Sequence, residues 1–298
     1  FEPKKRERKL TMSLVAIGGY GRSELNPHSD IDFMLLHSGT TPSVTRIFNH
    51  ELIEKLTGPG GLIYTLYDLG MKVGYSVRNI QDAVNVANDD MQTKTSLIES
   101  RLISGDAGLF EQFQKRVEVK CVRSHIDDYL QMRIADQDAR RVKFGNSALL
   151  QTPNIKNGCG GLRDYQNLLW MTHFKYGTRT LAELEAQEMI RPNNRAQLEE
   201  GYGFLLRVRN ELHYQTKRPS DDLPKALQPK VAWQLGYKDR SPARRLEAFM
   251  RELYMHMRRI HLITRMIERR LALRPKPSRR IPSLRSLFRG GEKQETLD

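Results

Sequence analysis

The sequence predicts an α+β protein, with a small mixed sheet in its first third and an α-helical bundle after it. Two short apolar, β-branched runs, at 13–17 and 31–36, are typical of buried strands. From residue 81 onward, apolar residues recur every three or four positions, as expected for packed helices. The change of pattern predicts one domain over residues 1–88, a helical domain over 89–273 and a basic tail over 274–298.

Two acidic residues open the second apolar run. Successive strand residues point to opposite faces, so Asp30 and Asp32 project from one face, about 6.5 Å apart along the backbone. Carboxylates that close repel each other unless a cation lies between them, and oxygen ligands suit Mg²⁺. Two such ions can hold the attacking and the leaving oxygen of a phosphoryl displacement. The pair therefore predicts a magnesium site for phosphoryl or nucleotidyl transfer.

A glycine turn joins the two strands. Gly18, Gly19 and Gly21 leave room for a polyphosphate to approach the backbone, where N–H groups at a helix start would favour an anion. An ordinary strand-to-helix turn followed by two surface aspartates is the alternative. Arg22 and Arg78 are candidates for phosphate contacts and equally for surface ion pairs.

A third carboxylate is expected because sites with two metal ions usually need one. The helix predicted over 44–56 and a glycine-rich turn lead into 62–68, which has the composition of a third strand ending at Asp68. A strand beside the second one would bring Asp68 to the same metal ions. The alternative is an aspartate that caps a loop at the strand end.

The second half of the chain is predicted to be helical, with further helices over 81–87, 91–103, 109–130, 162–176, 196–215 and 242–273. The exception is a glycine turn at 157–161. Gly160 and Gly161, with Lys156 and Arg163 nearby, could bind a phosphate. They could equally form a tight turn between domains, in which the charge of Asp164 favours the helix start.

Composition indicates a globular cytoplasmic enzyme. The chain has 298 residues, 39% of them hydrophobic, and no apolar run approaches 18 residues, so a membrane span is not expected. The two cysteines, Cys121 and Cys159, lack metal-ligand spacing. The net charge of +14 is concentrated near the C-terminal end, where prolines alternate with basic residues. This pattern favours a solvated linker over a nucleic-acid surface.

Four stretches together carry a resemblance to a known family. The first, Gly-Gly-Tyr-Gly-Arg-Ser-Glu-Leu-Asn-Pro-His-Ser-Asp-Ile-Asp at 18–32, resembles the signature of the DNA polymerase β-type nucleotidyltransferase superfamily, and within it the bacterial PII uridylyltransferases. Residues 68–78, 96–106 and 160–164 agree with that branch in the same order, so the resemblance covers about residues 14–270. Ser23 occupies a position where this branch more often has glycine.

The resemblance implies a polymerase β-like domain in which UMP moves from UTP to a tyrosine of the PII nitrogen-regulatory protein, releasing pyrophosphate. Two Mg²⁺ ions would be held by Asp30, Asp32 and Asp68, which are also the expected catalytic residues. The residues expected to bind the nucleotide are Gly18, Gly19, Arg22, Ser29, Gly160, Gly161 and Arg163.

Family members continue into an HD phosphohydrolase domain and two ACT domains, which this sequence lacks, so a fragment carrying the transferase half is expected. Three alternatives stay open. The chain could transfer AMP to a protein such as glutamine synthetase, since base preference cannot be read from one sequence. It could be a non-catalytic nucleotide sensor or PII-docking module, although three acidic residues argue against this. It could also be a terminal nucleotide transferase that uses the basic tail to bind RNA.

Overall fold

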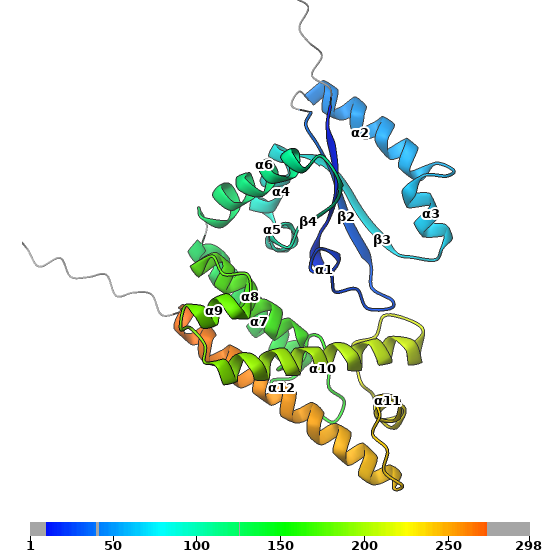
Figure 1. Cartoon of the computed structure of the whole chain (residues 1–298), viewed down its shortest axis with the longest axis vertical. Helices are drawn as coiled ribbons and strands as arrows, with labels where there is room; N and C mark the ends of the chain where they lie inside the picture. The colour runs from blue at the N-terminus through cyan, green and yellow to red at the C-terminus, as the bar shows by residue number, and fades with distance from the viewer. Residues whose placement is uncertain (1–9, 40–41, 125, 273–298) are drawn as a thin grey trace, which may run out of the picture.

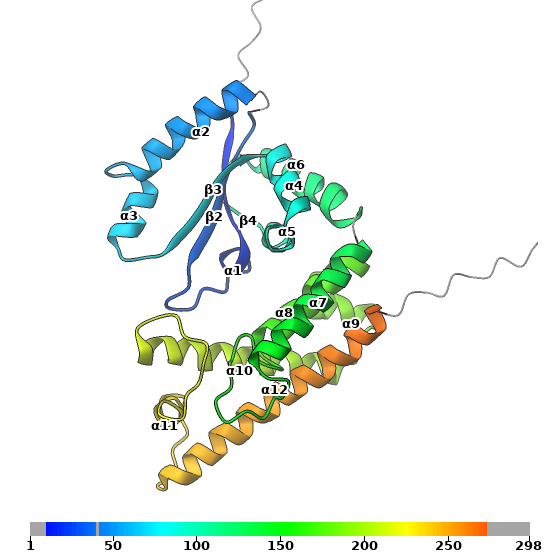
Figure 2. The ribbon, with the colours of Figure 1, turned by 180° about the vertical axis from the view of Figure 1, so that it is seen from behind.

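The computed structural model describes residues 10–39, 42–124 and 126–272. The sheet and its covering helices form one domain, and a set of longer helices forms a second domain beside it (Figures 1 and 2). The basic tail expected over 274–298 lies outside the described residues.

The described residues form one four-stranded mixed sheet, in the order β3-β2-β1-β4. Its strands are β1 (Met12–Ala16), β2 (Ile31–His37), β3 (Val73–Asn79) and β4 (Arg101–Gly105). β1 runs antiparallel to both β2 and β4, whereas β3 runs parallel to β2. The predicted α+β class, the small mixed sheet and the first two strands are confirmed.

β2 is buried on both faces because alternate residues enter different cores. Met34 and Leu36 pack with residues of α4 (Ile80–Asp89), α5 (Met91–Ile98) and α6 (Ala107–Val117). Phe33 and Leu35 pack on the other side against Ile63 of α3 (Leu62–Asp68), beside α2 (Pro42–Thr57). Layers of helices on both faces therefore hold the strand that carries Asp32 in place.

The strand predicted over 62–68 is wrong, because this segment is helix α3. Its aromatic and β-branched residues resemble a strand, but Ile63 and Leu66, three positions apart, are the ones that join the apolar core on the sheet, while Tyr64 and Tyr67 are exposed. Spacing of three fits one face of a helix. The third strand begins only at Val73.

The domain boundary expected at residue 88 is too early, since the sheet gains its fourth strand at 101–105. The helix predicted over 91–103 ends as α5 at Ile98, and the following residues pair with β1. The helix predicted over 109–130 is likewise divided. α6 ends at Val117, a π-helical turn covers Glu118–Val122, and α7 begins at Ile126.

The second domain is helical, as predicted. It contains α7 (Ile126–Phe144), α8 (Leu162–Tyr176), α9 (Leu181–Ala186), α10 (Pro192–Thr216), α11 (Gln228–Gln234) and α12 (Pro242–Ala272). The apolar stripe of α12 is buried at Phe249, Leu253, Met257, Ile260 and Ile267 and joins the main core with α8 and α10. None of the described helices combines the length and apolar character needed to cross a membrane.

Candidate functional site

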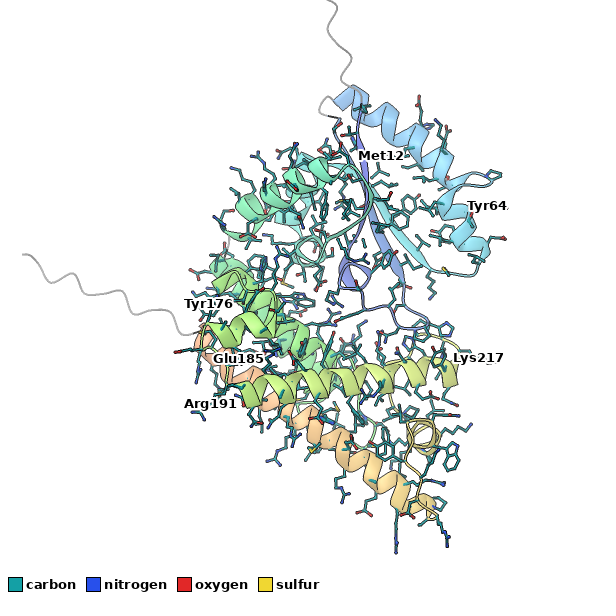
Figure 3. All side chains as sticks on the ribbon, in the orientation of Figure 1. Met12, Tyr64, Tyr176, Glu185, Arg191 and Lys217 are labelled. Atoms are coloured by element: carbon teal, nitrogen blue, oxygen red, sulfur yellow. The ribbon has the colours of Figure 1, made fainter. Side chains whose placement is uncertain are left out.

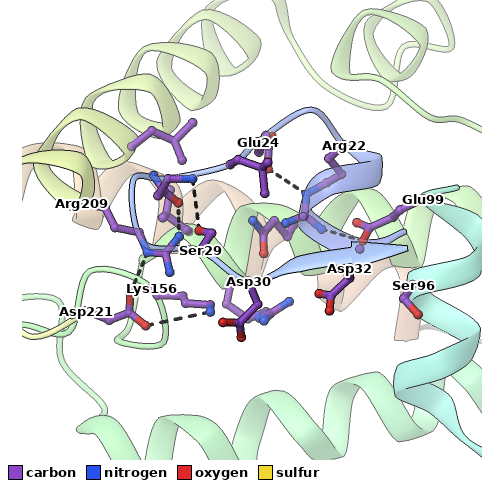
Figure 4. Close-up of a pocket in the computed structure, with 18 of the residues that line it drawn as sticks. Arg22, Glu24, Ser29, Asp30, Asp32, Ser96, Glu99, Lys156, Arg209 and Asp221 are labelled. Carbon is purple, nitrogen blue, oxygen red and sulfur yellow. Dashed lines mark hydrogen bonds and ion pairs between the residues drawn. The ribbon is translucent and has the colours of Figure 1, made fainter. Parts of the chain in front are cut away.

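A polar cleft of about 380 Å³ lies between the two domains (Figure 4). The sheet domain contributes the glycine loop after β1 and the start of β2, and the helical domain contributes α8, α10 and the loops before α8 and after α10. The lining residues used below are Gly18, Gly19, Arg22, Glu24, Asn26, His28, Ser29, Asp30, Asp32, Glu99, Lys156, Arg163, Gln166, Trp170, Arg209 and Asp221.

Asp30 and Asp32 lie together at the entrance to β2, and their carboxylates point to the same side (Figure 4). Asp30 is exposed and Asp32 is half-buried. Burial, and then the charge of Asp30, raise the pKa of Asp32. A cation bound between the two carboxylates would reverse that effect, because it favours their charged forms. The pair thus has the oxygen donors and the local excess of negative charge that a hard divalent cation requires.

Gly74 of β3 explains how Asp32 fits against the sheet. It is the register partner of Asp32, and a Cβ at position 74 would lie 2.3 Å from Asp32 Oδ1. Only glycine leaves the carboxylate room at this position. Gly18 lies close to the same carboxylate, since its Cβ would be 3.9 Å from Asp32 Oδ2, and its φ of +57° favours glycine.

The glycine loop continues through the single helical turn α1 (Gly18–Gly21) into a segment held by polar contacts. Arg22 forms ion pairs with Glu24 at 2.7 Å and with Glu99 at 2.6 Å. Ser29 Oγ accepts a hydrogen bond from the backbone N–H of Asn26 at 3.1 Å. Ser23 has a φ of +63°, in the region that favours glycine.

Helix α10 holds the same loop from the other domain. Tyr202 donates a hydrogen bond to Glu24 at 2.7 Å, and Arg209 and Asn210 both contact the side chain of Asn26. The backbone N–H of His28 donates to His213 at 3.2 Å. The loop that precedes Asp30 is therefore attached to α10 at three places along that helix.

Four cationic side chains line the cleft: Arg22, Lys156, Arg163 and Arg209. Arg22 and Arg209 have close acidic partners. Within the described ranges, no acidic side chain lies at ion-pair distance from Arg163, whose guanidinium instead lies 5.0 Å from the ring centre of Trp170. Burial, then the charges of Arg22 and Arg133, lower the pKa of Arg163 to about 10.

The pKa of Lys156 is lowered too. Its ammonium group is 4.0 Å from Asp221, and burial, then the charge of Arg209, lower its pKa. Cations that depress each other's pKa values are stabilised by an anion that binds among them. The helical side of the cleft is therefore suited to a strongly anionic ligand, opposite carboxylates that are suited to a divalent cation.

The structure does not bring Asp68 to the acidic pair. Asp68 is exposed at the end of α3 and is absent from the cleft lining, and Tyr64 of the same helix lies at the outer edge of the molecule (Figure 3). Because 62–68 is helical, the reason for placing Asp68 beside Asp32 no longer holds. Arg78 of β3 also lies outside the cleft lining.

Gly160 and Gly161 are buried and do not line the cleft. Gly160 has a φ of +74°, and a Cβ there would lie 1.9 Å from the carbonyl oxygen of Met257 in α12. Its N–H donates to Asp164 Oδ2 at 2.8 Å. Of the two interpretations of this turn, the structure supports close packing for the glycines, while Arg163, two residues on, faces the cleft.

Asp164 is fully buried at the centre of this turn. Arg140 lies 2.8 Å from Oδ1, and Arg141 and His261 lie 3.7 and 4.0 Å from Oδ2. Burial alone would raise the pKa of Asp164, but His261, Arg140 and Arg141 together lower it to about 2. Asp164, followed by Cys159, raises the pKa of His261 to about 9. The turn is held by a buried charge network.

Comparison with known proteins shows what the chain is similar to. Residues 128–268 match the family model described as GlnD PII-uridylyltransferase. The chain is 32% identical over 254 residues to the bifunctional uridylyltransferase/uridylyl-removing enzyme of Rhodospirillum rubrum, and 32% identical over 253 residues to that of Azospirillum brasilense. Each match covers 85% of this chain and 26% of the relative, so the chain spans about a quarter of the length of these enzymes. Residues 128–268 are thus similar to the GlnD PII-uridylyltransferase family, and the chain is similar to a part of the bifunctional uridylyltransferase/uridylyl-removing enzymes.

Proposed function

We propose that this chain is a nucleotidyltransferase unit that moves UMP from UTP to a tyrosine hydroxyl of a PII signalling protein and releases pyrophosphate. The observation that carries the proposal is the cleft itself, in which the Asp30 and Asp32 carboxylates lie opposite four cationic side chains, and one of these, Arg163, has no acidic side chain at ion-pair distance among the described residues. In a metal-bound triphosphate, the metal ion would balance the negative charge of the two carboxylates, and the phosphates would balance the positive charge of the cationic side chains. The names of the relatives supply the nucleotide and the acceptor.

Asp30 and Asp32 would hold Mg²⁺, since both present carboxylate oxygens to the cleft and their mutual repulsion favours a cation. The bound metal would neutralise charge on the phosphate that is transferred. Gly18 and Gly19 allow the phosphates to approach the loop. Arg163 and Lys156 would stabilise the triphosphate and the departing pyrophosphate by charge.

In this reaction the acceptor oxygen forms a bond to the α-phosphorus of UTP. The bond between that phosphorus and the bridging oxygen breaks, and the hydroxyl proton leaves to water. The protein forms no covalent bond to the substrate, so its contribution is alignment and charge stabilisation. The exposure of Asp30 at the edge of the cleft leaves room for a tyrosine carried by another protein.

Transfer of label from α-labelled UTP, with Mg²⁺, to the PII protein of the same organism tests the proposal. A PII protein with its acceptor tyrosine changed to phenylalanine and α-labelled ATP are the controls. Label on the unchanged acceptor, from UTP only, is expected. Label from ATP would favour adenylyl transfer instead. Binding of UTP without transfer to any acceptor would favour a nucleotide sensor.

Asp68→Asn is expected to leave the transfer rate within about threefold of the original, because the side chain is exposed and outside the cleft. The rate should be measured at saturating Mg²⁺ and compared with Asp30→Asn, which removes a residue of the cleft. A loss as large as that of Asp30→Asn would mean that α3 rearranges to bring Asp68 to the metal.

Arg163→Gln is expected to weaken UTP binding about 10- to 100-fold, the effect of losing a hydrogen bond to a charged group. Without nucleotide the variant should melt at the same or a higher temperature, because a buried cation repelled by Arg22 and Arg133 has been neutralised. Melting curves with and without UTP report both effects. Arg78→Gln, outside the cleft, is the matched control, and equal UTP binding by the two variants would contradict the assignment.

A further inference from the structure

Gln166 of α8 lies where the cleft meets a smaller cavity of about 190 Å³. The residue is 6% exposed, and its Oε1 has no hydrogen-bond partner among the described residues. Buried polar groups in folded proteins are nearly always paired, because an unpaired acceptor has lost its hydrogen bonds to water. An unpaired acceptor on a residue that lines a ligand cleft is therefore suited to a donor on the ligand.

A chain of hydrogen bonds fixes which way this amide points. Gln166 Nε2 donates to the hydroxyl of Tyr202 at 2.9 Å, and that hydroxyl donates to Glu24 at 2.7 Å. Glu24 also accepts from Arg22 at 2.7 Å. Burial, and then the charge of Glu24, raise the pKa of Tyr202, so its hydroxyl keeps its proton.

The single proton of the Tyr202 hydroxyl is committed to Glu24, so towards Gln166 the hydroxyl can only accept. The amide nitrogen must then face Tyr202, and the oxygen must face away from it. A flipped amide would place two acceptors against each other. The orientation of Gln166 thus follows from the hydrogen bond that Tyr202 donates to Glu24.

We propose that Gln166 recognises the base of the nucleotide by accepting the N3–H of uracil at Oε1. This inference rests on the proposed function, since it concerns the nucleotide bound in the same cleft. Cytosine has a lone pair at N3, which would face the lone pairs of Oε1. Adenine has no ring N–H on its pairing edge, and guanine is a larger purine. Leu169 and Tyr165, which line the smaller cavity, offer apolar surface for a planar ring.

Nucleotide analogues test this on the unaltered 298-residue chain. Dissociation constants in the presence of Mg²⁺ should be compared for UTP, N3-methyl-UTP, 5-methyl-UTP and CTP. The 5-methyl analogue keeps the N3–H and controls for the size of a methyl group. N3-methyl-UTP and CTP are expected to bind about 10- to 100-fold more weakly than UTP, because each leaves Oε1 without a donor.

Two variants locate the effect. Gln166→Leu, similar in size, should bind UTP, CTP and N3-methyl-UTP with dissociation constants within about threefold of one another. Tyr202→Phe frees the amide to rotate and should strengthen CTP binding relative to UTP. Gln187→Leu, at an exposed position at the end of α9, is the matched control and should discriminate as the unaltered chain does.

Equal binding of N3-methyl-UTP and 5-methyl-UTP by the unaltered chain would overturn this inference and leave the proposed function intact. Failure to bind any of the triphosphates would overturn the proposed function, and the inference with it. The comparison of analogues needs no substitution, so it decides the question even if Gln166→Leu fails to fold.

Discussion

Asp32→Asn is expected to reduce nucleotidyl transfer by at least about 10²- to 10³-fold, because it removes a charged ligand from the centre of the cleft. The fold should survive, since asparagine has nearly the same shape and Gly74 leaves room for it. The single-turnover rate with labelled UTP measures the loss, and Asp30→Asn should behave in the same way. Turnover close to that of the unaltered chain with either variant would refute the metal assignment.

The same substitution should raise the melting temperature of the chain without metal at neutral pH. The pKa of Asp32 is raised by burial and by Asp30, so its ionised form is disfavoured in the folded state. The stability that such a group contributes is present at low pH and is lost as pH rises through the raised pKa. Asparagine cannot ionise, so this loss should disappear. Added Mg²⁺ should stabilise the unaltered chain and leave Asp32→Asn unchanged.

Asp164→Ala is expected to destabilise the helical domain by about 3–5 kcal/mol, the range found when one partner of a buried ion pair is removed. Arg140 and Arg141 would remain among buried groups, and the Gly160 N–H would lose its acceptor. Urea unfolding followed by circular dichroism measures the change. Asp138→Ala is the matched control, since Asp138 also pairs with Arg141 but is exposed. The control should change stability by less than about 1 kcal/mol.

The pH dependence of the free energy of unfolding should show whether Asp164 stabilises the domain through its charge or only through packing. The contribution of Asp164, whose folded pKa is about 2, is complete above its unfolded pKa of about 4 and is lost as pH falls towards 2. The contribution of His261, whose folded pKa is about 9, is complete below about pH 6.5 and is lost as pH rises through 9. Asp164→Ala should therefore reduce the loss of stability both at low pH and at high pH. An unchanged pH profile would show that the side chain matters only for packing.

Local sequence predicts the parts of this protein that depend on neighbouring residues. The β1 and β2 strands, the glycine loop and the shared face of Asp30 and Asp32 all follow from spacing over some twenty residues. Helix α12 follows from a long apolar stripe. β4 was missed because its only signal is pairing with β1, almost ninety residues earlier. Residues 62–68 form helix α3 because packing on the sheet outweighs the β-like composition of that segment.

Some residues of the candidate site could likewise be predicted from local sequence, and others could not. Arg163 could be recognised because it lies beside a glycine turn, but that turn offered two interpretations, and only the contact with Met257 separates them. Arg209, Asp221 and Gln166 have no local signature, since they are ordinary residues in or near helices until the two domains meet. Asp68 was misplaced by the error in secondary structure. Apart from Lys156 and Arg163, the helical half of the cleft could not be predicted because it is formed by tertiary structure.

The attachment of the glycine loop to α10 has a mechanical consequence. α10 also packs along α12, where Ile260 would lie 3.2 Å from a Cβ at Gly201, so the two helices are in close contact. Packed helices tend to shift as rigid bodies. A movement of α12, which contributes no residue to the cleft lining, would reach Glu24, Asn26 and His28 through α10 and would alter the cleft. The two packed helices would then move together and shift the glycine loop with them.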